Sequence, residues 1–222
     1  MSWPKVKLGE VAEFINGKAF KPSDWHGSGT KIIRIQNLTN SDKPFNQTQT
    51  KVDSKYYVEY GDLLVSWSAT LGIFEWKQET AFLNQHIFKV IPDEEKVVKS
   101  YLKYSIQDML ESMEKYAHGS TMRHINRKEF LSTKISLPSL EEQRRIAAIL
   151  DKAGEVERAS AKVQEMRDET IRATFLDMFG DPVVNPKDWN LEKFENVLKI
   201  INGRNQKKVV CETGKYPIYG SG

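Results

Sequence analysis

From residue 138 the chain reads Pro138-Ser-Leu-Glu-Glu-Gln-Arg-Arg-Ile-Ala147, and no further proline follows until Pro182. The proline and serine favour a helix start, and the two glutamates fall in the first turn, where negative charge suits the helix dipole. Between this start and Gly180 there is a single glycine, Gly154. The sequence therefore predicts one helix of about 40 residues over 139–180.

Apolar residues recur along this helix at three- and four-residue spacing, which gives it one apolar face. They are Ile146, Ile149, Ala153, Val156, Val163, Met166, Phe175, Met178 and Phe179. At ~1.5 Å per residue the helix spans roughly 60 Å, longer than a compact domain needs. We expect a second helix to cover this face, as in a coiled coil; the alternative is a long helix packed across its own domain.

Residues 1–138 have the short apolar and alternating runs, cut by Gly, Asn, Asp and Pro, that are typical of a β-rich domain. The strands predicted are Lys31–Gln36, Asp62–Ser68, Gly72–Trp76, His86–Ile91 and Thr133–Leu137. The helices predicted within the domain are Leu8–Ile15, Lys96–Lys115 and Arg127–Ser132, the last one capped by Asn126. The fold class is therefore α+β, a β-rich domain followed by a long helix.

A pattern at the start of the chain returns near its end. Residues Trp3-Pro-Lys-Val-Lys-Leu8 to Ile15-Asn-Gly-Lys18 match Trp189-Asn-Leu-Glu-Lys-Phe194 to Ile201-Asn-Gly-Arg204 at a constant offset of 186, as 189 minus 3 and 202 minus 16 both give. Such an offset indicates a duplicated domain with its connector. The domains expected are 1–138, the helix 139–180, and 181–222 as a linker with the opening of an incomplete second domain.

The composition excludes several classes of protein. The 222 residues carry a net charge of +3, with one cysteine and four histidines in no zinc-ligand spacing, so neither a disulfide nor a structural zinc site is expected. No apolar run is long enough to cross a bilayer, and the first residues lack a signal peptide. We expect a cytoplasmic protein that does not associate with membranes.

Motifs that would indicate catalysis are missing from the sequence. It has no glycine-rich phosphate loop, no carboxylate cluster suited to a nuclease metal, and no nucleophile site. Asn185-Pro-Lys-Asp188 is faintly similar to the loop with which amino-methyltransferases hold a flipped base, but it lacks the second proline and the aromatic residue, so we interpret it as a turn. We therefore predict no catalytic residues and no metal ligands.

A basic, glycine-containing segment over 115–128 indicates nucleic-acid binding, and more strongly than any of these motifs indicates catalysis. Arginine and asparagine side chains there have the forked geometry that reads base edges, and hydroxyls and backbone amides suit phosphate oxygens. The alternative is an ordinary basic loop. Polar residues that follow two of the predicted strands offer the same donors and acceptors, although each can equally cap a turn. Ser66-Trp-Ser-Ala-Thr70 indicates either a groove-facing loop or a core tryptophan.

Taken in order, these segments resemble the specificity (S) subunit of type I restriction-modification enzymes. The resemblance rests on Trp3–Gly17, Gly61–Gly72, Leu83–Val90 and, most specifically, Gly119-Ser-Thr leading to Ile135-Ser-Leu-Pro-Ser-Leu-Glu-Glu-Gln143-Arg-Arg-Ile-Ala. It implies target-recognition domains that each read one half of a split double-stranded DNA sequence. It also implies two long antiparallel helices that set the gap and hold the modification (methyltransferase) subunits.

The resemblance further implies that this chain binds no cofactor. S-adenosylmethionine, ATP and Mg²⁺ are expected on the modification and restriction (translocase/endonuclease) subunits. A usual S subunit has two recognition domains and two helices, whereas this chain has one of each and a fragment. We therefore expect a homodimer in which the long helix pairs antiparallel with a second copy, and a palindromic target with half-sites about one duplex turn apart.

Fourteen residues are predicted to contact DNA. They are Lys18, Arg34, Gln36, Asn37, Ser66, Ser68, Thr70, Gln85, His86, Ser120, Thr121, Arg123, His124 and Arg127. Two other hypotheses remain open. One is the recognition fragment of a stand-alone DNA adenine methyltransferase, which would need a cofactor loop; the other is a coiled-coil adaptor without DNA affinity.

Overall fold

The computed structural model of the chain describes residues 3–40, 42–68, 70–116 and 126–201. It divides into two compact units, Met1–Ser160 and Ala161–Gly222. The boundary falls inside one continuous helix, α4 (Leu140–Phe179).

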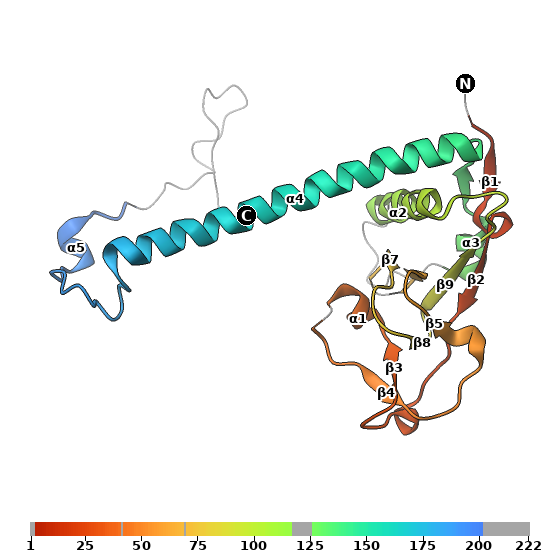
Figure 1. The fold of residues 1–222 in the computed structure, drawn as a ribbon, viewed down its shortest axis with the longest axis horizontal. Helices are drawn as coiled ribbons and strands as arrows, with labels where there is room; N and C mark the ends of the chain where they lie inside the picture. The colour runs from red at the N-terminus through yellow and green to blue at the C-terminus, as the bar shows by residue number, and fades with distance from the viewer. Residues whose placement is uncertain (1–2, 41, 69, 117–125, 202–222) are drawn as a thin grey trace. The chain divides into compact units, whose positions relative to one another are not determined.

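The first unit is built on two four-stranded sheets (Figure 1). One has the order β2-β9-β6-β7 and is antiparallel throughout. The other has the order β4-β3-β8-β5, with β3 and β8 parallel. The strands are β2 (Ala12–Asn16), β3 (Thr30–Ile33), β4 (Asn46–Thr48), β5 (Tyr57–Val58), β6 (Leu63–Ser66), β7 (Gly72–Glu75), β8 (Ala81–Leu83) and β9 (Ile87–Pro92).

A third, two-stranded sheet ties the two ends of the domain together. In it β1 (Lys5–Lys7) pairs antiparallel with β10 (Lys134–Ser136). Further bonds extend the ladder at both ends, from Leu8 N to Thr133 O at 3.0 Å and from Leu137 N to Pro4 O at 2.8 Å. The short helices are η1 (Leu8–Glu10), η2 (Pro22–Asp24), α1 (Ile35–Thr39), η3 (Ser54–Tyr56) and α3 (Arg127–Ser132).

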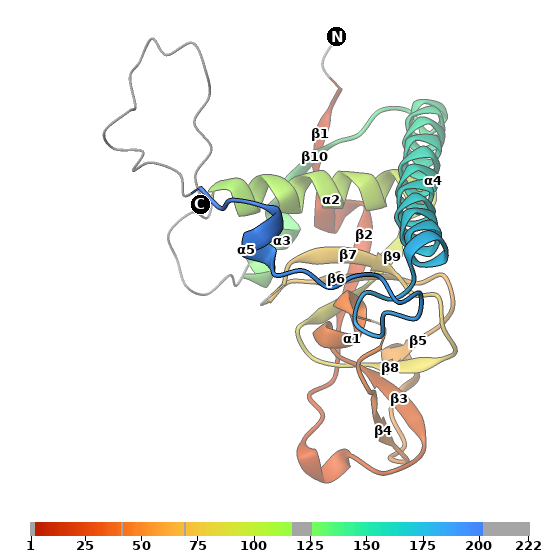
Figure 2. The same ribbon diagram turned by 90° about the vertical axis from the view of Figure 1, so that its left-hand side faces the viewer.

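Helix α2 (Lys99–Tyr116) lies over the β2-β9-β6-β7 sheet, as Figure 2 shows, and closes the main core. Leu102 and Ile106 on its apolar face are fully buried and share the main core with the sheet residues Leu63 and Phe88. The ring of Phe88 also lies among other aromatic side chains, in contact with Phe14, Trp67 and Phe130. Aromatic pairs of this kind contribute about 0.5–1.5 kcal/mol each beyond the area that they bury.

Most of the predicted elements are confirmed with small shifts of their ends. The strands expected at 62–68, 72–76, 86–91 and 133–137 are β6, β7, β9 and β10, and the helix expected at 127–132 is α3 with its predicted cap. The cap is the Asn126 Oδ1 atom, which accepts a bond from Lys128 N at 2.9 Å. The helix expected from residue 96 is α2, which begins three residues later.

The helix predicted over residues 8–15 is wrong. Only its first three residues form a helical turn, η1, and residues 12–16 form strand β2. The apolar residues of this stretch have helical spacing, but Ala12 and Phe14 are buried while Glu13 between them is exposed. This alternation, together with pairing to β9, stabilises the strand.

The strand predicted over residues 31–36 is right only as far as Ile33. The chain then turns into α1, because the Asn37 side chain accepts a bond from Arg34 N at 3.1 Å and closes the first turn of the helix. The same side chain donates to Lys43 O at 3.0 Å. A buried asparagine thus ends the strand earlier than its apolar pattern indicates.

The long helix predicted over 139–180 is confirmed as α4. Ser139 Oγ accepts from Glu142 N at its start. A two-bond ion pair with Arg145 follows, and it holds the pKa of Glu142 below its usual value. At the other end, Gly180 follows the helix in the left-handed conformation, with φ +78. Two of the last carbonyl groups of the helix accept hydrogen bonds from side chains. Lys187 Nζ donates to Met178 O at 2.9 Å, and Trp189 Nε1 donates to Phe179 O at 2.8 Å. Both ends of α4 are therefore capped.

The second unit contains the start of the repeated pattern. Its short helix α5 (Phe194–Val197) lies at the same 186-residue offset from η1, as 194 minus 8 gives. Leu8 is fully buried in the first copy, whereas its counterpart Phe194 is 64% exposed. Among the described residues, no helix is both long and apolar enough to span a membrane.

Candidate nucleic-acid interface

Four chain segments meet where the two large sheets adjoin, and we call this region the junction surface. It consists of residues 16–18, 33–36, 66–68 with 70, and 83–87. Backbone bonds hold the segments together, from Lys18 N to Leu83 O at 2.9 Å, from Gln85 N to Lys18 O at 2.9 Å and from Asn84 N to Ile33 O at 3.3 Å. A fourth backbone bond, from Trp67 N to His86 O at 3.3 Å, connects the segment that follows β6.

The sheet topology explains why these segments converge. Because β3 and β8 are parallel, with Ile33 opposite Leu83, the polar residues that follow the two strands emerge side by side. Strands β2 and β6 both end where β9 begins, since Ser66 lies opposite Ile87. Residues far apart in the sequence are thus gathered at one edge, as is common at binding sites.

Gly17 is required at the centre of this junction. A Cβ atom at this position would lie 2.0 Å from Asn84 O, closer than any real contact allows. The turn between β8 and β9, which faces Gly17, has a constrained backbone of its own. His86 in this turn adopts φ +70, a left-handed conformation that few residues other than glycine take. The ring of His86 packs edge-on against that of Trp67, with the ring centroids 5.0 Å apart.

Two cations of the junction surface lie over aromatic rings. The ammonium group of Lys18 is 5.1 Å from the centre of the Phe20 ring, and the guanidinium group of Arg34 is 5.7 Å from that of Trp25. Such contacts contribute about 0.5–1 kcal/mol at exposed sites and hold the charged groups in place. The sequence did not predict Trp25, since only the fold brings it beside Arg34.

The structure brings six of the predicted DNA-contact residues to this surface with at least part of the side chain accessible: Lys18, Arg34, Gln36, Thr70, Gln85 and His86. Three others are buried, namely Asn37, Ser66 and Ser68. Asn37 caps α1, and Ser66 Oγ donates to Ser68 O at 3.2 Å. The Asn37 and Ser66 side chains therefore serve the fold, and none of the three is among the accessible side chains of the junction surface.

The remaining predicted contacts belong to the basic segment. Arg127 is exposed on α3, and its guanidinium donates to Phe14 O at 3.1 Å, which places it beside β2. Ser120, Thr121, Arg123 and His124 lie outside the described residues.

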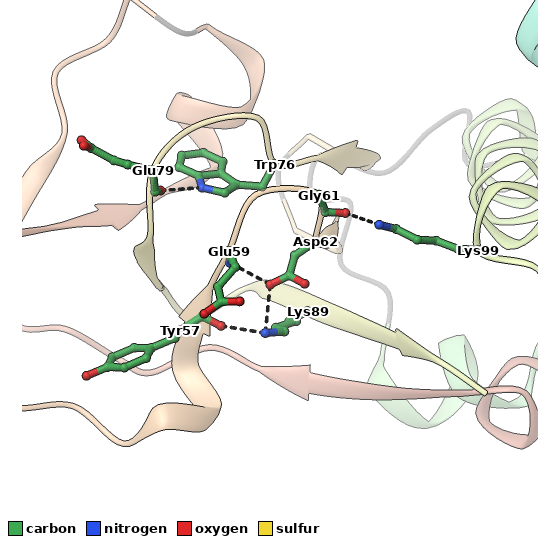
Figure 3. Close-up of polar contacts among 8 residues, drawn as sticks. All are labelled: Tyr57, Glu59, Gly61, Asp62, Trp76, Glu79, Lys89 and Lys99. Atoms are coloured by element: carbon green, nitrogen blue, oxygen red, sulfur yellow. Dashed lines mark hydrogen bonds and ion pairs between the residues drawn. The ribbon is translucent and has the colours of Figure 1, made fainter. Parts of the chain in front are cut away.

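The Gly61–Asp62 turn, at the opposite end of β6, has a structural role (Figure 3). Asp62 accepts a bond from Glu59 N at 2.8 Å and pairs with the partly buried Lys89 at 2.9 Å. Lys99 at the start of α2 donates to Gly61 O. These contacts tie the β6–β7 hairpin to β9 and to α2.

The side chains of the junction surface are suited to binding a polyanion that also carries hydrogen-bond donors and acceptors. Arg34 and Lys18 carry positive charge, and Gln36 and Gln85 carry amides that both donate and accept. Among the described residues no group of histidine, cysteine or acidic side chains is arranged to hold a metal ion.

The apolar face predicted for α4 divides into two parts. Ile146 and Ala147 pack against the core of the first unit. From Ile149 onward the face is exposed, with Val156 at 62% and Val163 at 66%. The other exposed apolar residues of this face are Met166, Phe175, Met178 and Phe179.

Comparison with known proteins agrees with this reading of the fold. A family model described as the type I restriction modification DNA specificity domain matches residues 2–164. The type I restriction enzyme EcoBI specificity subunit of Escherichia coli is 26% identical over 168 residues, which cover 74% of this chain and 35% of that protein. The MjaIX specificity subunit of Methanocaldococcus jannaschii is 23% identical over 244 residues, covering 97% of this chain and 56% of that protein. The chain thus spans about a third to just over half the length of these relatives.

Two solved structures share the fold. The HsdS subunit from Thermoanaerobacter tengcongensis has a TM-score of 0.58 and 24% identity, covering 73% of this chain and 40% of that one. A chain from a structure of type I R-M system assembly and conformational transition has a TM-score of 0.62 and 23% identity, covering 78% of this chain and 43% of that one. Because the family match takes in nearly the whole β-rich domain and more than half of α4, this chain belongs to the family of type I restriction-modification DNA specificity domains.

Proposed function

We propose that this chain is a noncatalytic, sequence-specific DNA-recognition subunit of a type I restriction-modification complex. The observation that carries the proposal is the family match over residues 2–164, which contains the whole junction surface. In this proposal the β-rich domain reads one half of a bipartite target. The methyltransferase and restriction subunits supply the chemistry, together with S-adenosylmethionine, ATP and Mg²⁺.

The side chains of the junction surface support DNA reading. The forked guanidinium of Arg34 matches the acceptor pair of guanine, and the amides of Gln36 and Gln85 match the donor and acceptor of adenine. Lys18 is suited to a phosphate, a contact that positions the domain without reading sequence. The left-handed turn at His86 presents Gln85 as an exposed side chain between two strands.

The DNA contact is tested by titrating a selected duplex with the full chain at several salt concentrations. Lys18→Ala should weaken binding and reduce the slope of log affinity against log salt by about one, because one phosphate contact is lost. Gln85→Ala should instead relax the preference for one base, by about 1–3 kcal/mol, with little change in slope.

Lys77→Ala provides the matched control, because this exposed lysine follows β7 at the end opposite the junction surface. Its affinity should equal that of the wild type. An equal loss in Lys77→Ala and Lys18→Ala, or a wild-type affinity that does not depend on salt, would contradict the proposed interface.

We further propose that α4 pairs antiparallel with α4 of a second copy. Support comes from the apolar face that stays exposed after residue 149, since exposed apolar stripes of this extent usually bind a partner. A twofold pair would bring two recognition domains together on one DNA and create the surface that holds the methyltransferase subunits.

Light scattering at micromolar concentration tests this pairing. The wild type should have twice the mass of one 25.6 kDa chain. The double variant Val156→Glu and Val163→Glu should have the mass of one chain, because paired helices would bury four carboxylates. Arg158→Glu, on the opposite side of the helix, should remain dimeric. A wild-type mass of one chain would refute the pairing.

A further inference from the structure

Helix α4 is attached to the recognition domain by one row of its side chains. Gln143, Ala147 and Asp151 follow one another at four-residue spacing, so they form a single ridge along the helix. Ala147, in the middle of the row, is 2% exposed and packs in the main core. The two polar members each bond to α2 or to the turn before it, and all of these residues lie within the first unit.

Gln143 makes the first of these attachments. Its side chain is fully buried, yet every polar atom has a partner. Oε1 accepts from Val98 N at 2.8 Å, and Nε2 donates to Lys96 O at 3.1 Å and to Pro138 O at 2.9 Å. A glutamate would lack the donors and a leucine would lack all three bonds, so an amide of this length is required.

The turn that Gln143 contacts is itself held in place. Asp93 pairs with Lys96 at 2.7 Å, and Asp93 O accepts bonds from Lys96 N and Val97 N. The bond from Lys96 lowers the pKa of Asp93 from its usual value. The partner of Gln143 is therefore a closed turn at the base of α2, and it provides a firm anchor.

Tyr104 and Asp151 make the second attachment. The Tyr104 hydroxyl on α2 donates to Asp151 Oδ1 at 2.6 Å. Two causes raise the pKa of Tyr104 to about 12: the larger is burial, and the smaller is this bond to a carboxylate. The hydroxyl therefore keeps its proton at neutral pH. Asp151 lies eight residues beyond Gln143, or about 12 Å along the helix. Two bonds this far apart fix a direction as well as a position.

We propose that the Gln143–Ala147–Asp151 ridge is a latch that sets the angle at which α4 leaves the recognition domain, and thereby fixes the length of the gap between the two DNA half-sites. The inference rests on the proposed function. A helix of roughly 60 Å that pivots by about 10° at its base moves its far end by about 10 Å, or about three base pairs. The length of the helix can therefore set the gap between the half-sites only if the angle at which α4 leaves the recognition domain is fixed.

The test uses duplexes that carry the two half-sites selected by the wild-type chain at a series of gap lengths. The wild type should bind one gap length best. Tyr104→Phe, and more strongly Gln143→Met with Tyr104→Phe, should bind the gaps one and two base pairs shorter and longer within about threefold of the best one. The base preference within each half-site should not change, since no latch residue lies on the junction surface.

Matched controls use the exposed Gln107 on α2 and the exposed Tyr60. Gln107→Met and Tyr60→Phe should keep the wild-type gap preference. Tyr104→Phe loses one hydroxyl at a partly exposed position and is expected to fold, so it tests the latch even if Gln143→Met is unstable. A wild-type gap preference retained in Tyr104→Phe would overturn the latch, whether or not the double variant folds. A wild-type chain that selects no paired half-sites would overturn the proposed function as well.

Discussion

Gly17 illustrates how one residue without a side chain makes the junction surface possible. It allows the backbone of residues 16–18 to cross directly beside that of Asn84, and its amide donates to Ile87 O at 3.1 Å. The Asn-Gly pair recurs at the start of the second copy, at residues 202 and 203. The duplicated pattern therefore includes the residue that this close approach requires.

We predict that Gly17→Ala destabilises the domain by roughly 3 kcal/mol, because the added methyl group would force two backbones apart. Urea denaturation followed by circular dichroism measures this change. Gly27→Ala is the control, since a Cβ at Gly27 meets nothing within 4 Å. If both variants unfold at the same urea concentration, the close approach at Gly17 does not exist in solution.

At the scale of elements, the β6–β7 hairpin depends on the turn that precedes it. Asp62 closes this turn and also pairs with Lys89. Asp62→Ala should cost about 2 kcal/mol, because both the backbone bond and the charge pair are lost. Asp62→Asn should cost less, since an amide oxygen still accepts from Glu59 N.

The same two variants separate stability from recognition. The turn lies at the end of β6 opposite the junction surface, so folded Asp62→Ala should bind DNA as the wild type does. Thermal unfolding and DNA titration of the same samples provide the comparison. A specific loss of DNA affinity in a fully folded Asp62→Asn protein would place this turn in the interface.

Helix α4 provides a second prediction at this scale. A heptad inserted between Val156 and Val163 keeps the apolar face nearly in register and lengthens the helix by about 10 Å. The preferred gap between half-sites should grow by roughly two to three base pairs. Selection from duplexes with varied gaps measures it, and an unchanged gap would show that the helix does not set the spacing.

For the whole molecule, local patterns in the sequence predicted the elements better than their arrangement. The long helix, α2 and four of the strands were predicted because each has a period or a cap within its own residues. Strand β2 was mistaken for a helix, since pairing with β9 overrides its apolar spacing. Strands β1, β4, β5 and β8 are so short that only their partners define them.

The candidate interface was predictable to a similar degree. Polar residues that follow two of the predicted strands pointed to Gln36 and Gln85, and the structure leaves both exposed on the junction surface. The parallel pairing of β3 with β8, which places Arg34 beside Asn84, has no signal within either strand. The burial of Asn37 could not be predicted from the sequence either, because its partners Lys43 and Pro44 lie in a loop whose path the sequence does not define.

Selection of bound duplexes from a fully randomised pool by the purified chain tests the proposed role most directly. Two short half-sites in inverted orientation should be enriched, separated by a constant number of unselected base pairs, since two recognition domains are held apart by paired helices. Enrichment of no motif, or of one contiguous motif without a gap, would contradict this.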